Sequence, residues 1–377
     1  MACAPLLLSV ACSGSEGPTA VLPPGPTEGY AALALGLHHS CGIRSEEGTF
    51  CRGRNESGEL GDGTLRSSSR AVRVAGAPAL VALALGESHT CGLTATGAAF
   101  CWGANDRGAL GTGDTDPRRR PEPVSGGLDL RALSAGGGST CGLDASGRAW
   151  CWGANSNGRL GNGTHEDRLE PGLVAGDGEF MAIDVGETHV CALDREGGAW
   201  CWGGNSHGGL GDGTTEDRSL PVRVQGGHRF VVLALGTAHT CGLAADGSAW
   251  CWGENVLGQL GDDTRIDRSV PVQVLATLAF VTLDAGAAHT CALTMGGQAY
   301  CWGWNEHGGQ VGDGTVLNRS VPTPVATMEQ FVRIVLGRLA GCGVRSDGLV
   351  WCWGNNEFGE LGGGGPVNLL PLPLDDP

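Results

Sequence analysis

The stretch His239-Thr-Cys-Gly-Leu-Ala-Ala-Asp-Gly-Ser-Ala-Trp-Cys-Trp-Gly253, with the tail Glu254-Asn-Val-Leu-Gly-Gln-Leu-Gly261, decides the fold of this chain. Two cysteines stand ten residues apart in it, and tryptophans flank the second one. The Asp-Gly pair between them predicts a hairpin with the three-residue loop Ala245–Gly247, in which glycine supplies the left-handed position. Trp250 and Trp252 are expected on one face of the third strand and Cys251 on the other, because side chains alternate along a strand.

This stretch occurs seven times along the chain, with a spacing of 50 residues five times and 51 once. The first cysteines of the pairs are Cys41, Cys91, Cys141, Cys191, Cys241, Cys291 and Cys342, and the second are Cys51, Cys101, Cys151, Cys201, Cys251, Cys301 and Cys352. A fixed period of this length is typical of solenoids and propellers. The units lie near residues 30–79, 80–129, 130–179, 180–229, 230–279, 280–330 and 331–377.

Each unit predicts four strands and no helix. The apolar run from Phe230 predicts a buried first strand, the segments around Cys241 and Cys251 predict the hairpin, and Pro271–Val274 predicts a fourth strand that begins with proline at a sheet edge. Four strands in each of seven units give an all-β, seven-bladed β-propeller. The pattern leaves open whether residues 368–374 complete blade seven or reach back to blade one.

The repeated run resembles a known family. Gly236-Thr-Ala-His239-Thr, and the segment Gly203-Gly-Asn205-Ser-His-Gly208-Gly-Leu210-Gly211-Asp-Gly213-Thr, are similar to the repeat of the regulator of chromosome condensation family, in a secreted bacterial-type branch with a repeated cysteine pair. The resemblance covers about residues 30–374 and implies a seven-bladed propeller that recognises proteins on a face. By analogy with the founding member it also implies a guanine-nucleotide exchange factor for a small GTPase. The near-constant period leaves no room for the inserted β-wedge on which that exchange activity depends.

Charge and cysteine content restrict the compartment and the partners. The formal net charge is −16, which disfavours binding to nucleic acid and to anionic membranes. The 16 cysteines suit an oxidising compartment. Residues 1–12 resemble an export or lipoprotein signal with Cys12 as the lipidation candidate, although no basic residue precedes the apolar run. Residues 13–29 are expected to form a flexible tether. These features predict an exported protein, in the cell envelope or outside the cell, with a lipid anchor as its only membrane attachment.

The cysteine pairs allow three interpretations. Cross-strand cysteines in such a hairpin are within disulfide range, so we expect seven disulfides that join the two cysteines of each unit. The alternatives are reduced, buried thiols or metal ligands. No close pair of the C-x-x-C type occurs, and neither a metal nor a cofactor is therefore expected.

Other repeated residues have a structural and a functional interpretation. Histidine recurs two residues before the first cysteine in five units, and we expect Ser139 and Gly341 to replace it in the other two. It either holds its strand to a neighbouring loop or forms a metal-binding or pH-sensitive ring. Recurrent arginines such as Arg218 either form salt bridges within the repeat or a basic rim for an acidic partner. Gly-Asp-Gly-Thr loops predict Asx-turns and not calcium sites.

Positions that break the repeat are the candidates for binding. These positions are Arg52, Arg54, Arg118, Arg119, Arg120, Trp304 and Phe358. No nucleophile elbow, H-E-x-x-H pair, Walker loop or dinucleotide fingerprint occurs. We therefore expect a monomeric, non-catalytic propeller that binds a protein through its blade loops. The alternatives are the exchange factor and a glycan-binding or hydrolytic propeller, the latter needing paired carboxylates that converge at the channel mouth.

Overall fold

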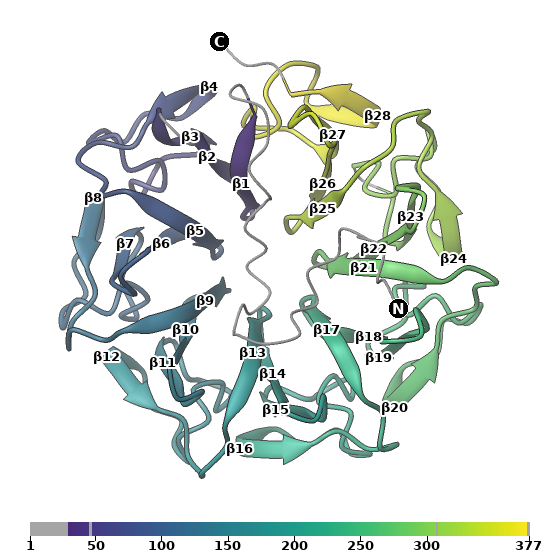
Figure 1. Cartoon of the computed structure of the whole chain (residues 1–377), viewed down its shortest axis with the longest axis horizontal. Coiled ribbons are helices and arrows are strands. Elements are labelled where there is room, and N and C mark those ends of the chain that lie inside the picture. Colours follow the sequence, from purple (N-terminus) through teal and green to yellow (C-terminus); the bar gives the residue numbers. More distant parts are fainter. Residues whose placement is uncertain (1–28, 45–46, 307, 375–377) are drawn as a thin grey trace, which may run out of the picture.

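The computed structural model describes residues 29–44, 47–306 and 308–374 (Figure 1). Its 28 strands form seven four-stranded antiparallel sheets, arranged as blades around a central axis. The predicted seven-bladed, all-β propeller is thus confirmed. The signal-like segment, Cys12 and nearly all of the expected tether lie outside the described residues.

Each blade uses four consecutive strands, with the first nearest the axis (Figure 1). Blade one has β1 (Tyr30–Leu35), β2 (His39–Arg44), β3 (Gly48–Gly53) and β4 (Ser68–Arg73). Blade two has β5 (Leu80–Leu85), β6 (His89–Thr94), β7 (Ala99–Gly103) and β8 (Arg118–Pro123). Blade three has β9 (Leu130–Gly136), β10 (Ser139–Asp144), β11 (Ala149–Gly153) and β12 (Arg168–Leu173).

The remaining blades repeat this order. Blade four has β13 (Phe180–Val185), β14 (His189–Asp194), β15 (Ala199–Gly203) and β16 (Arg218–Arg223). Blade five has β17 (Phe230–Leu235), β18 (His239–Ala244), β19 (Ala249–Gly253) and β20 (Arg268–Gln273). Blade six has β21 (Phe280–Ala285), β22 (His289–Thr294), β23 (Ala299–Gly303) and β24 (Arg319–Pro324). Blade seven has β25 (Arg333–Leu336), β26 (Ala340–Val344), β27 (Val350–Asn355) and β28 (Val367–Pro373).

The central hairpin of each blade has the predicted register. Cys241 lies directly opposite Cys251, and the Ala244 N–H donates to the Ser248 carbonyl across a three-residue loop. Gly247 adopts φ +84°, a value that favours glycine because it has no Cβ. The cysteines of every pair form a disulfide, with Cα atoms 4.1 Å apart. The predicted pairing is therefore the pairing in the structure.

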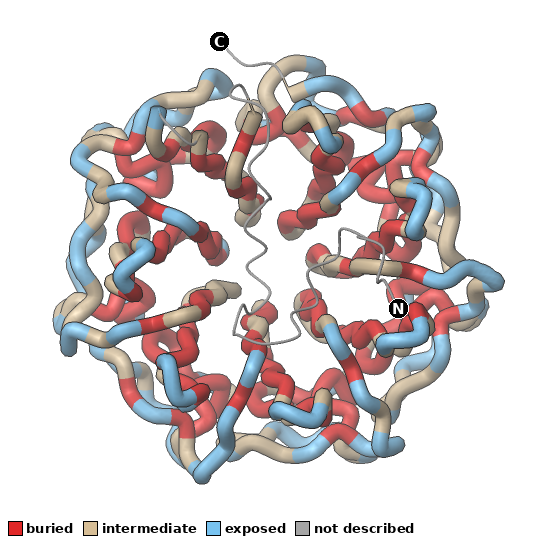
Figure 2. The backbone as a smooth tube through the Cα atoms, in the orientation of Figure 1, coloured by how far each residue is buried: buried red, intermediate tan, exposed pale blue. Residues whose placement is uncertain are grey.

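Alternation along the third strand explains how the blades stack. Trp252 is fully buried and packs against the Cys191–Cys201 disulfide of the preceding blade. Trp250, on the same face, is only half-buried. Each blade is thus bulky on one side and small on the other, and neighbouring blades interdigitate. Buried residues concentrate in the inner strands, while residues at the periphery are mostly half-buried or exposed (Figure 2).

The fourth strand begins earlier than the sequence predicts. β20 begins at Arg268, so Pro271 lies inside the strand and not at its start. The register shifts between Cys251 and Gly253, opposite this segment. An irregular edge strand can hold a proline internally because the missing N–H is not required by the ladder.

Blade seven is completed by its own fourth strand. β28 pairs with β27, and no sheet of the described chain contains strands from both of its ends. Residues 368–374 therefore do not reach back to blade one. The ring closes by side-by-side packing, in which Tyr30 and Leu33 share a core cluster with Val335 of blade seven.

A repeated set of hydrogen bonds joins neighbouring blades. In blade five, the His239 Nε2 lies 3.0 Å from the Thr290 Oγ1 of blade six. Thr290 Oγ1 in turn donates to the Gln259 carbonyl of blade five, and the Trp302 Nε1 donates to the same carbonyl. The histidine is thus structural, as one interpretation expected, but its partner is a threonine in the next blade and not a loop.

Three of the seven joints between neighbouring blades depart from this pattern. Between blades three and four, Ser139 stands in place of histidine and Val190 in place of threonine. In blade seven the register places Ala340 at the histidine position. The assignment of Gly341 was wrong by one residue, because Gly341 stands at the threonine position. His289 of blade six consequently has no threonine to meet, and neither ring nitrogen is hydrogen-bonded to the described residues.

Candidate functional site

Two kinds of loop lie on one face of the ring, which we call the loop face. Antiparallel order places the turn between the first and second strands at the same end of a blade as the long loop between the third and fourth. A buried asparagine holds each long loop. In blade five, Asn255 Oδ1 accepts from the Leu260 N–H, and its Nδ2 donates to the carbonyls of Thr264 and Ile266.

The turns between first and second strands form a ring around the axis, and we call them axial turns. Each begins with glycine, and the next residue varies between blades: Leu37, Glu87, Gly137, Glu187, Thr237, Ala287 and Arg338. Arg338 Nη1 of blade seven lies 3.1 Å from Glu187 Oε2 and 3.6 Å from Glu87 Oε1. The Thr237 hydroxyl also donates to Glu187. One guanidinium thus links blade seven to blades two and four across the axis.

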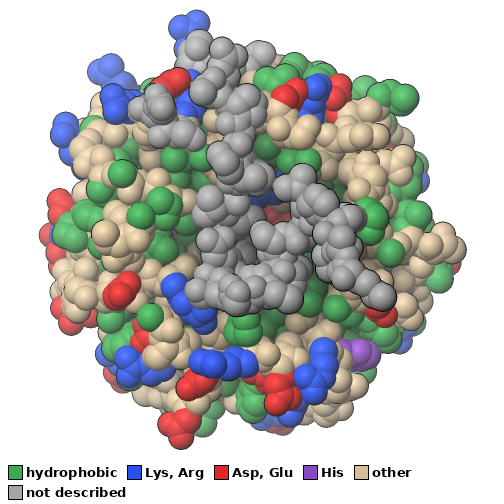
Figure 3. All heavy atoms as spheres, viewed as in Figure 1, with side chains coloured by type: hydrophobic (Ala, Val, Ile, Leu, Met, Phe, Trp, Pro, Cys, Tyr) green, Lys and Arg blue, Asp and Glu red, His purple; other side chains and the backbone are tan. Residues whose placement is uncertain are grey.

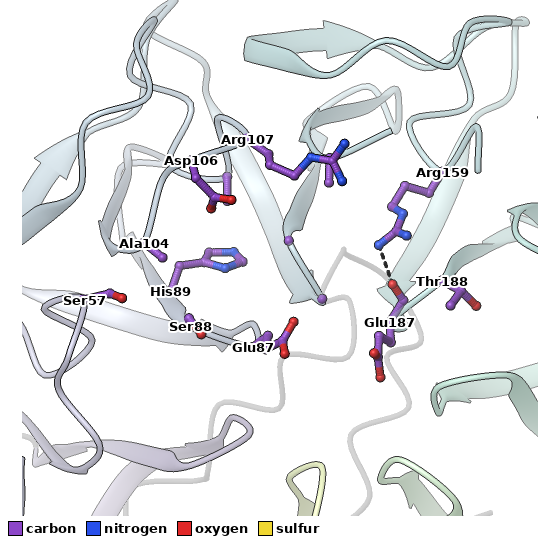
Figure 4. A pocket seen from close by; sticks show the side chains of 14 residues that line it. Ser57, Glu87, Ser88, His89, Ala104, Asp106, Arg107, Arg159, Glu187 and Thr188 are labelled. Atoms are coloured by element: carbon purple, nitrogen blue, oxygen red, sulfur yellow. Dashed lines mark hydrogen bonds between the residues drawn. The ribbon is translucent and has the colours of Figure 1, made fainter. Parts of the chain in front are cut away.

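A pocket of about 460 Å³ opens beside this cluster, between blades two, three and four (Figure 4). It exists where the repeat contributes small residues: Ala109, Gly137 and Gly138. Gly137 adopts φ +51°, and a Cβ there would lie 2.7 Å from the Glu187 carbonyl oxygen and 3.1 Å from an Arg159 nitrogen. In this positive-φ conformation a Cβ would clash with the next axial turn, so the place requires glycine.

Arg159 forms one wall of the pocket. Its side chain donates to the Glu187 carbonyl through Nη1 (Figure 4) and to Asn157 Oδ1 through Nη2. The residue is only 8% exposed, and its Nε has no partner among the described residues. Burial lowers its pKa, and the positive charge of Arg107 lowers it further, whereas Glu187 raises it.

The polar groups in the pocket do not form a catalytic pair. Ser88 Oγ accepts a hydrogen bond of 2.6 Å from Arg54, not from the adjacent His89. The His89 ring instead faces Thr140, and burial lowers its pKa to about 4. It is thus neutral and engaged in a joint between blades, where it cannot serve as a base for Ser88.

Two pairs of carboxylates lie near the axis, and both are engaged. Arg338 contacts both Glu87 and Glu187 and pairs with the two carboxylates at once. Asp184 accepts from Ser134 and the Leu235 N–H, and so bridges blades three, four and five.

Asp284 has the same bridging role between blades six and seven, because its carboxylate accepts from the Leu336 N–H. Burial raises the pKa of Asp184, and it raises the pKa of Asp284 to about 7. Their hydrogen bonds to neighbouring strands indicate a structural role.

Three of the predicted binding candidates lie on the loop face. Arg54 and Trp304 occupy the same place in blades one and six, where their backbone N–H groups donate to axial turns. The ring of Phe358 in blade seven lies 4.9 Å from that of His38 in blade one. The structure therefore brings these three repeat breaks to one side of the ring.

Arg52 is not available at the surface. It is 3% exposed, and it donates to the Tyr30 hydroxyl at a distance of 3.1 Å. It occupies the place that tryptophan fills in the other blades, at the joint between blades seven and one. As a surface contact the prediction was wrong, because this position points into the joint.

The remaining candidates lie at the periphery, on β8. Arg118 pairs with Asp114 at 2.6 Å, whereas Arg119 and Arg120 are exposed. Basic side chains gather along the upper left edge in Figure 3, over β4 and β8. We define the arginine edge as Arg66, Arg70, Arg73, Arg119 and Arg120.

The other repeated charges have structural roles. Asp262 Oδ1 accepts from the Thr264 N–H as in an Asx-turn, and its other oxygen pairs with Arg268 at 3.0 Å. The recurrent arginine thus contacts the loop of its own blade. Within the described ranges, no three histidine, cysteine, aspartate or glutamate residues are placed to hold a metal ion.

The charged groups around the pocket are not among the residues predicted from the sequence. Glu87, Glu187 and Arg338 occupy the variable place after the glycine of each axial turn, and Arg159 occupies the variable place before Leu160. Variation at these places within an otherwise regular repeat is visible in the sequence and could have marked them as candidates. That they lie close together could not be predicted, because their proximity depends on how the ring brings distant blades together.

Comparison with known proteins agrees with the fold. The family model of the RCC1-like domain matches residues 126–375, and models of the RCC1 (regulator of chromosome condensation) repeat match residues 80–109 and 96–143. No curated protein sequence matches the chain.

Solved structures share the fold at low sequence identity. Human WBSCR16 aligns with a TM-score of 0.77 and 20% identity over 86% of this chain and 92% of its own. Prp20p from Saccharomyces cerevisiae, reported with its binding to Gsp1p and histones, aligns with a TM-score of 0.76 and 22% identity over 92% and 88%. The receptor kinase CR4 ectodomain of Physcomitrella patens aligns with a TM-score of 0.57 and 23% identity over 85% and 73%.

These structural likenesses establish the fold and not the activity. The RCC1-like domain model spans most of the propeller, and the seven-bladed architecture agrees with it. The chain therefore belongs to the RCC1-like domain family.

Proposed function

We propose that this chain is an exported, non-catalytic propeller that binds a partner protein through its loop face. The observation that carries the proposal is the gathering of repeat breaks on that face. Arg54, Trp304 and Phe358 lie there together with the pocket and the charged cluster of Arg338. Departures from a repeat are where a scaffold gains specificity.

The chemistry of the pocket supports binding over catalysis. Ser88 is held by Arg54, His89 is held in a joint between blades, and the glutamates are held by Arg338. An enzyme needs a nucleophile or base that is free to reach its substrate. The side chains of Glu87 and Glu187 are 47% and 28% exposed, so their oxygens can still accept hydrogen bonds from a partner's side chains at the rim of an interface.

The relatives favour a protein partner without identifying it. Prp20p is reported with Gsp1p and histones, and yeast RCC1 (Prp20) is bound to Kap60 in another structure. In the described part of this chain every blade has four strands, which supports a scaffold without an inserted wedge. The net charge of −16 supports a partner other than nucleic acid.

The disulfides support an exported protein. Seven cross-strand disulfides suit an oxidising compartment. Among the residues that the structure describes, no helix is long and apolar enough to cross a membrane. We propose that residues 1–12 direct export, that Cys12 carries a lipid anchor, and that the propeller is a monomer.

The test is affinity capture with a variant of the loop face. Arg54→Ala, Trp304→Ala and Phe358→Asn introduce residues that other blades carry at these places, Ala104 and Asn157. Met295→Ser, at a residue that is 75% exposed on the opposite face, is the matched control. Cross-linking in the source organism's envelope and medium should recover a partner with the wild type and the control, but not with the triple variant. Recovery of cytosolic GTPases alone, with faster nucleotide exchange, would contradict the proposal.

A further inference from the structure

The fourth strand of each blade has one unpaired edge at the periphery of the ring. Such an edge can pair with another chain, and proline protects it because it removes an N–H donor. Six of the fourth strands contain proline at the same place: Pro121, Pro171, Pro221, Pro271, Pro322 and Pro371. In β4 of blade one this place is taken by Ala71.

The register shows which way the Ala71 N–H points. Val72 lies opposite Cys51, as Val222 lies opposite Cys201 in blade four, so Ala71 corresponds to Pro221. Proline fits this place in six blades without disturbing the ladder to the third strand. That ladder therefore does not use an N–H here, and the Ala71 N–H is directed outward.

A carbonyl on the same edge is also left open. In six blades the loop of the preceding blade donates to the residue two before the proline position, as Gly213 N–H does to the Ser269 carbonyl. At ring closure the corresponding residues are Gly364 and Ser69, and they form no such bond. Ser69 is exposed, whereas Ser219 and Ser269 are half-buried. β4 thus presents an acceptor and a donor two residues apart on one side of the strand.

The charge around this edge is positive in an acidic protein. Arg66, Arg70 and Arg73 lie on or beside β4, and Arg119 and Arg120 lie on β8 of the next blade. Within the described chain, none of these five guanidinium groups forms an ion pair or a hydrogen bond. The arginine edge in Figure 3 is therefore free to meet negative charge.

We propose that β4 binds an extended, acidic segment of a partner protein, which adds to blade one as a fifth strand. Backbone hydrogen bonds to Ser69 and Ala71 would supply the pairing, and the arginine edge would select acidic side chains. A polyanion without a peptide backbone would use the arginines alone. This site lies at the periphery and is distinct from the loop face of the proposed function.

The test uses two substitutions at one residue. Ala71→Pro removes the outward N–H and introduces the residue that the other six blades carry at this place. Ala71→Val keeps the N–H. The probe is a fluorescent synthetic peptide of alternating glutamate and threonine, with a lysine–threonine peptide as its counterpart. We expect Ala71→Pro to weaken binding of the acidic peptide roughly tenfold, as for one lost backbone hydrogen bond in an interface. Ala71→Val should stay within about twofold, and binding should slow amide exchange at residues 69–73.

A second variant tests the charge. Arg70→Gln with Arg73→Gln should weaken the acidic peptide and reduce its dependence on salt. Equal affinity for the Pro and Val variants would overturn strand addition, and sensitivity to the arginines alone would indicate a polyanion surface instead. A dimer of the free protein that Ala71→Pro abolishes would show that a second copy occupies the edge. Failure of the acidic peptide to bind the wild-type protein, while partner capture through the loop face persists, would refute strand addition and leave the proposed function standing.

Discussion

Gly137 shows how one residue shapes the candidate site. Its positive φ and the close approach of the Glu187 carbonyl leave no room for a side chain, and its small size opens the pocket beside Arg159. A β-carbon would force the axial turns of blades three and four apart. Replacing Gly137 by alanine therefore costs folding free energy through both backbone strain and a steric clash. Replacing a positive-φ glycine in open space costs only the backbone strain.

Gly137→Ala should therefore destabilise the protein more than a matched control. Gly127→Ala is that control, because Gly127 has φ +60° and a Cβ added there would meet no other atom within 4 Å. We expect a loss of roughly 2–3 kcal/mol for Gly137→Ala and about 1 kcal/mol for Gly127→Ala. Urea unfolding of the oxidised proteins measures both. Equal losses would show that the contact with blade four does not constrain this turn.

The carboxyl group of Asp284 gives a prediction about pH. Burial raises its pKa to about 7, above the value near 3.9 of an unfolded aspartate. A raised carboxyl pKa contributes stability that is fully present below pH 4 and is lost as the pH rises toward 7. Alanine fills this place in blade five, as Ala234, so Asp284→Ala should fold.

Between pH 4 and pH 7, the unfolding free energy of the wild type should fall relative to that of Asp284→Ala by on the order of 2–4 kcal/mol. Denaturation at a series of pH values tests this difference. Parallel curves for the two proteins would mean that Asp284 titrates normally in the folded state.

At the scale of the element, the contacts at the joint between two neighbouring blades contribute to the stability of the ring. His239 meets Thr290, and burial lowers the pKa of His239 to about 4, so the neutral ring is held in place by its partner. Ser139 and Val190 replace both partners together at the joint of blades three and four. Removing one partner of a buried hydrogen bond, which leaves the other polar group unpaired, costs more folding free energy than replacing both partners together.

A double-mutant cycle on this joint should show strong coupling. Thr290→Val leaves His239 unpaired and should cost about 1–3 kcal/mol. His239→Ser combined with Thr290→Val reproduces the Ser139–Val190 joint and should recover part of that loss. The coupling energy is calculated from the unfolding free energies of the wild type, His239→Ser, Thr290→Val and the double variant. Additive effects would show that the contact contributes nothing of its own.

Elements differ in how well the sequence predicts them. The hairpin of Cys241 and Cys251 was predictable, because its turn, alternation and cysteine spacing are all local. The fourth strand was predicted to begin at Pro271 but begins at Arg268, because the irregular pairing opposite Trp252 is not a local signal. The threonine partner of His239 lies 51 residues away, and no single unit reveals it.

At the scale of the whole molecule, the repeat count determined the fold but not the closure of the ring. Blade seven is closed by its own β28, and packing around Tyr30 joins it to blade one. The burial of Arg52 at this joint and the meeting of Arg338 with Glu87 and Glu187 depend on three-dimensional closure. The non-repeating positions were identifiable from the sequence, but which of them face solvent was not.

Counting free thiols by intact mass tests whether seven blades, each closed by one disulfide, form an exported scaffold. Protein purified from its source without reductant is denatured and alkylated, with and without prior reduction. Only Cys3 and Cys12 lie outside the blade pairs. We expect at most two labelled cysteines before reduction, and labelling of every cysteine present after reduction. Fourteen further labelled thiols in the unreduced sample would contradict the disulfides and the oxidising compartment with them.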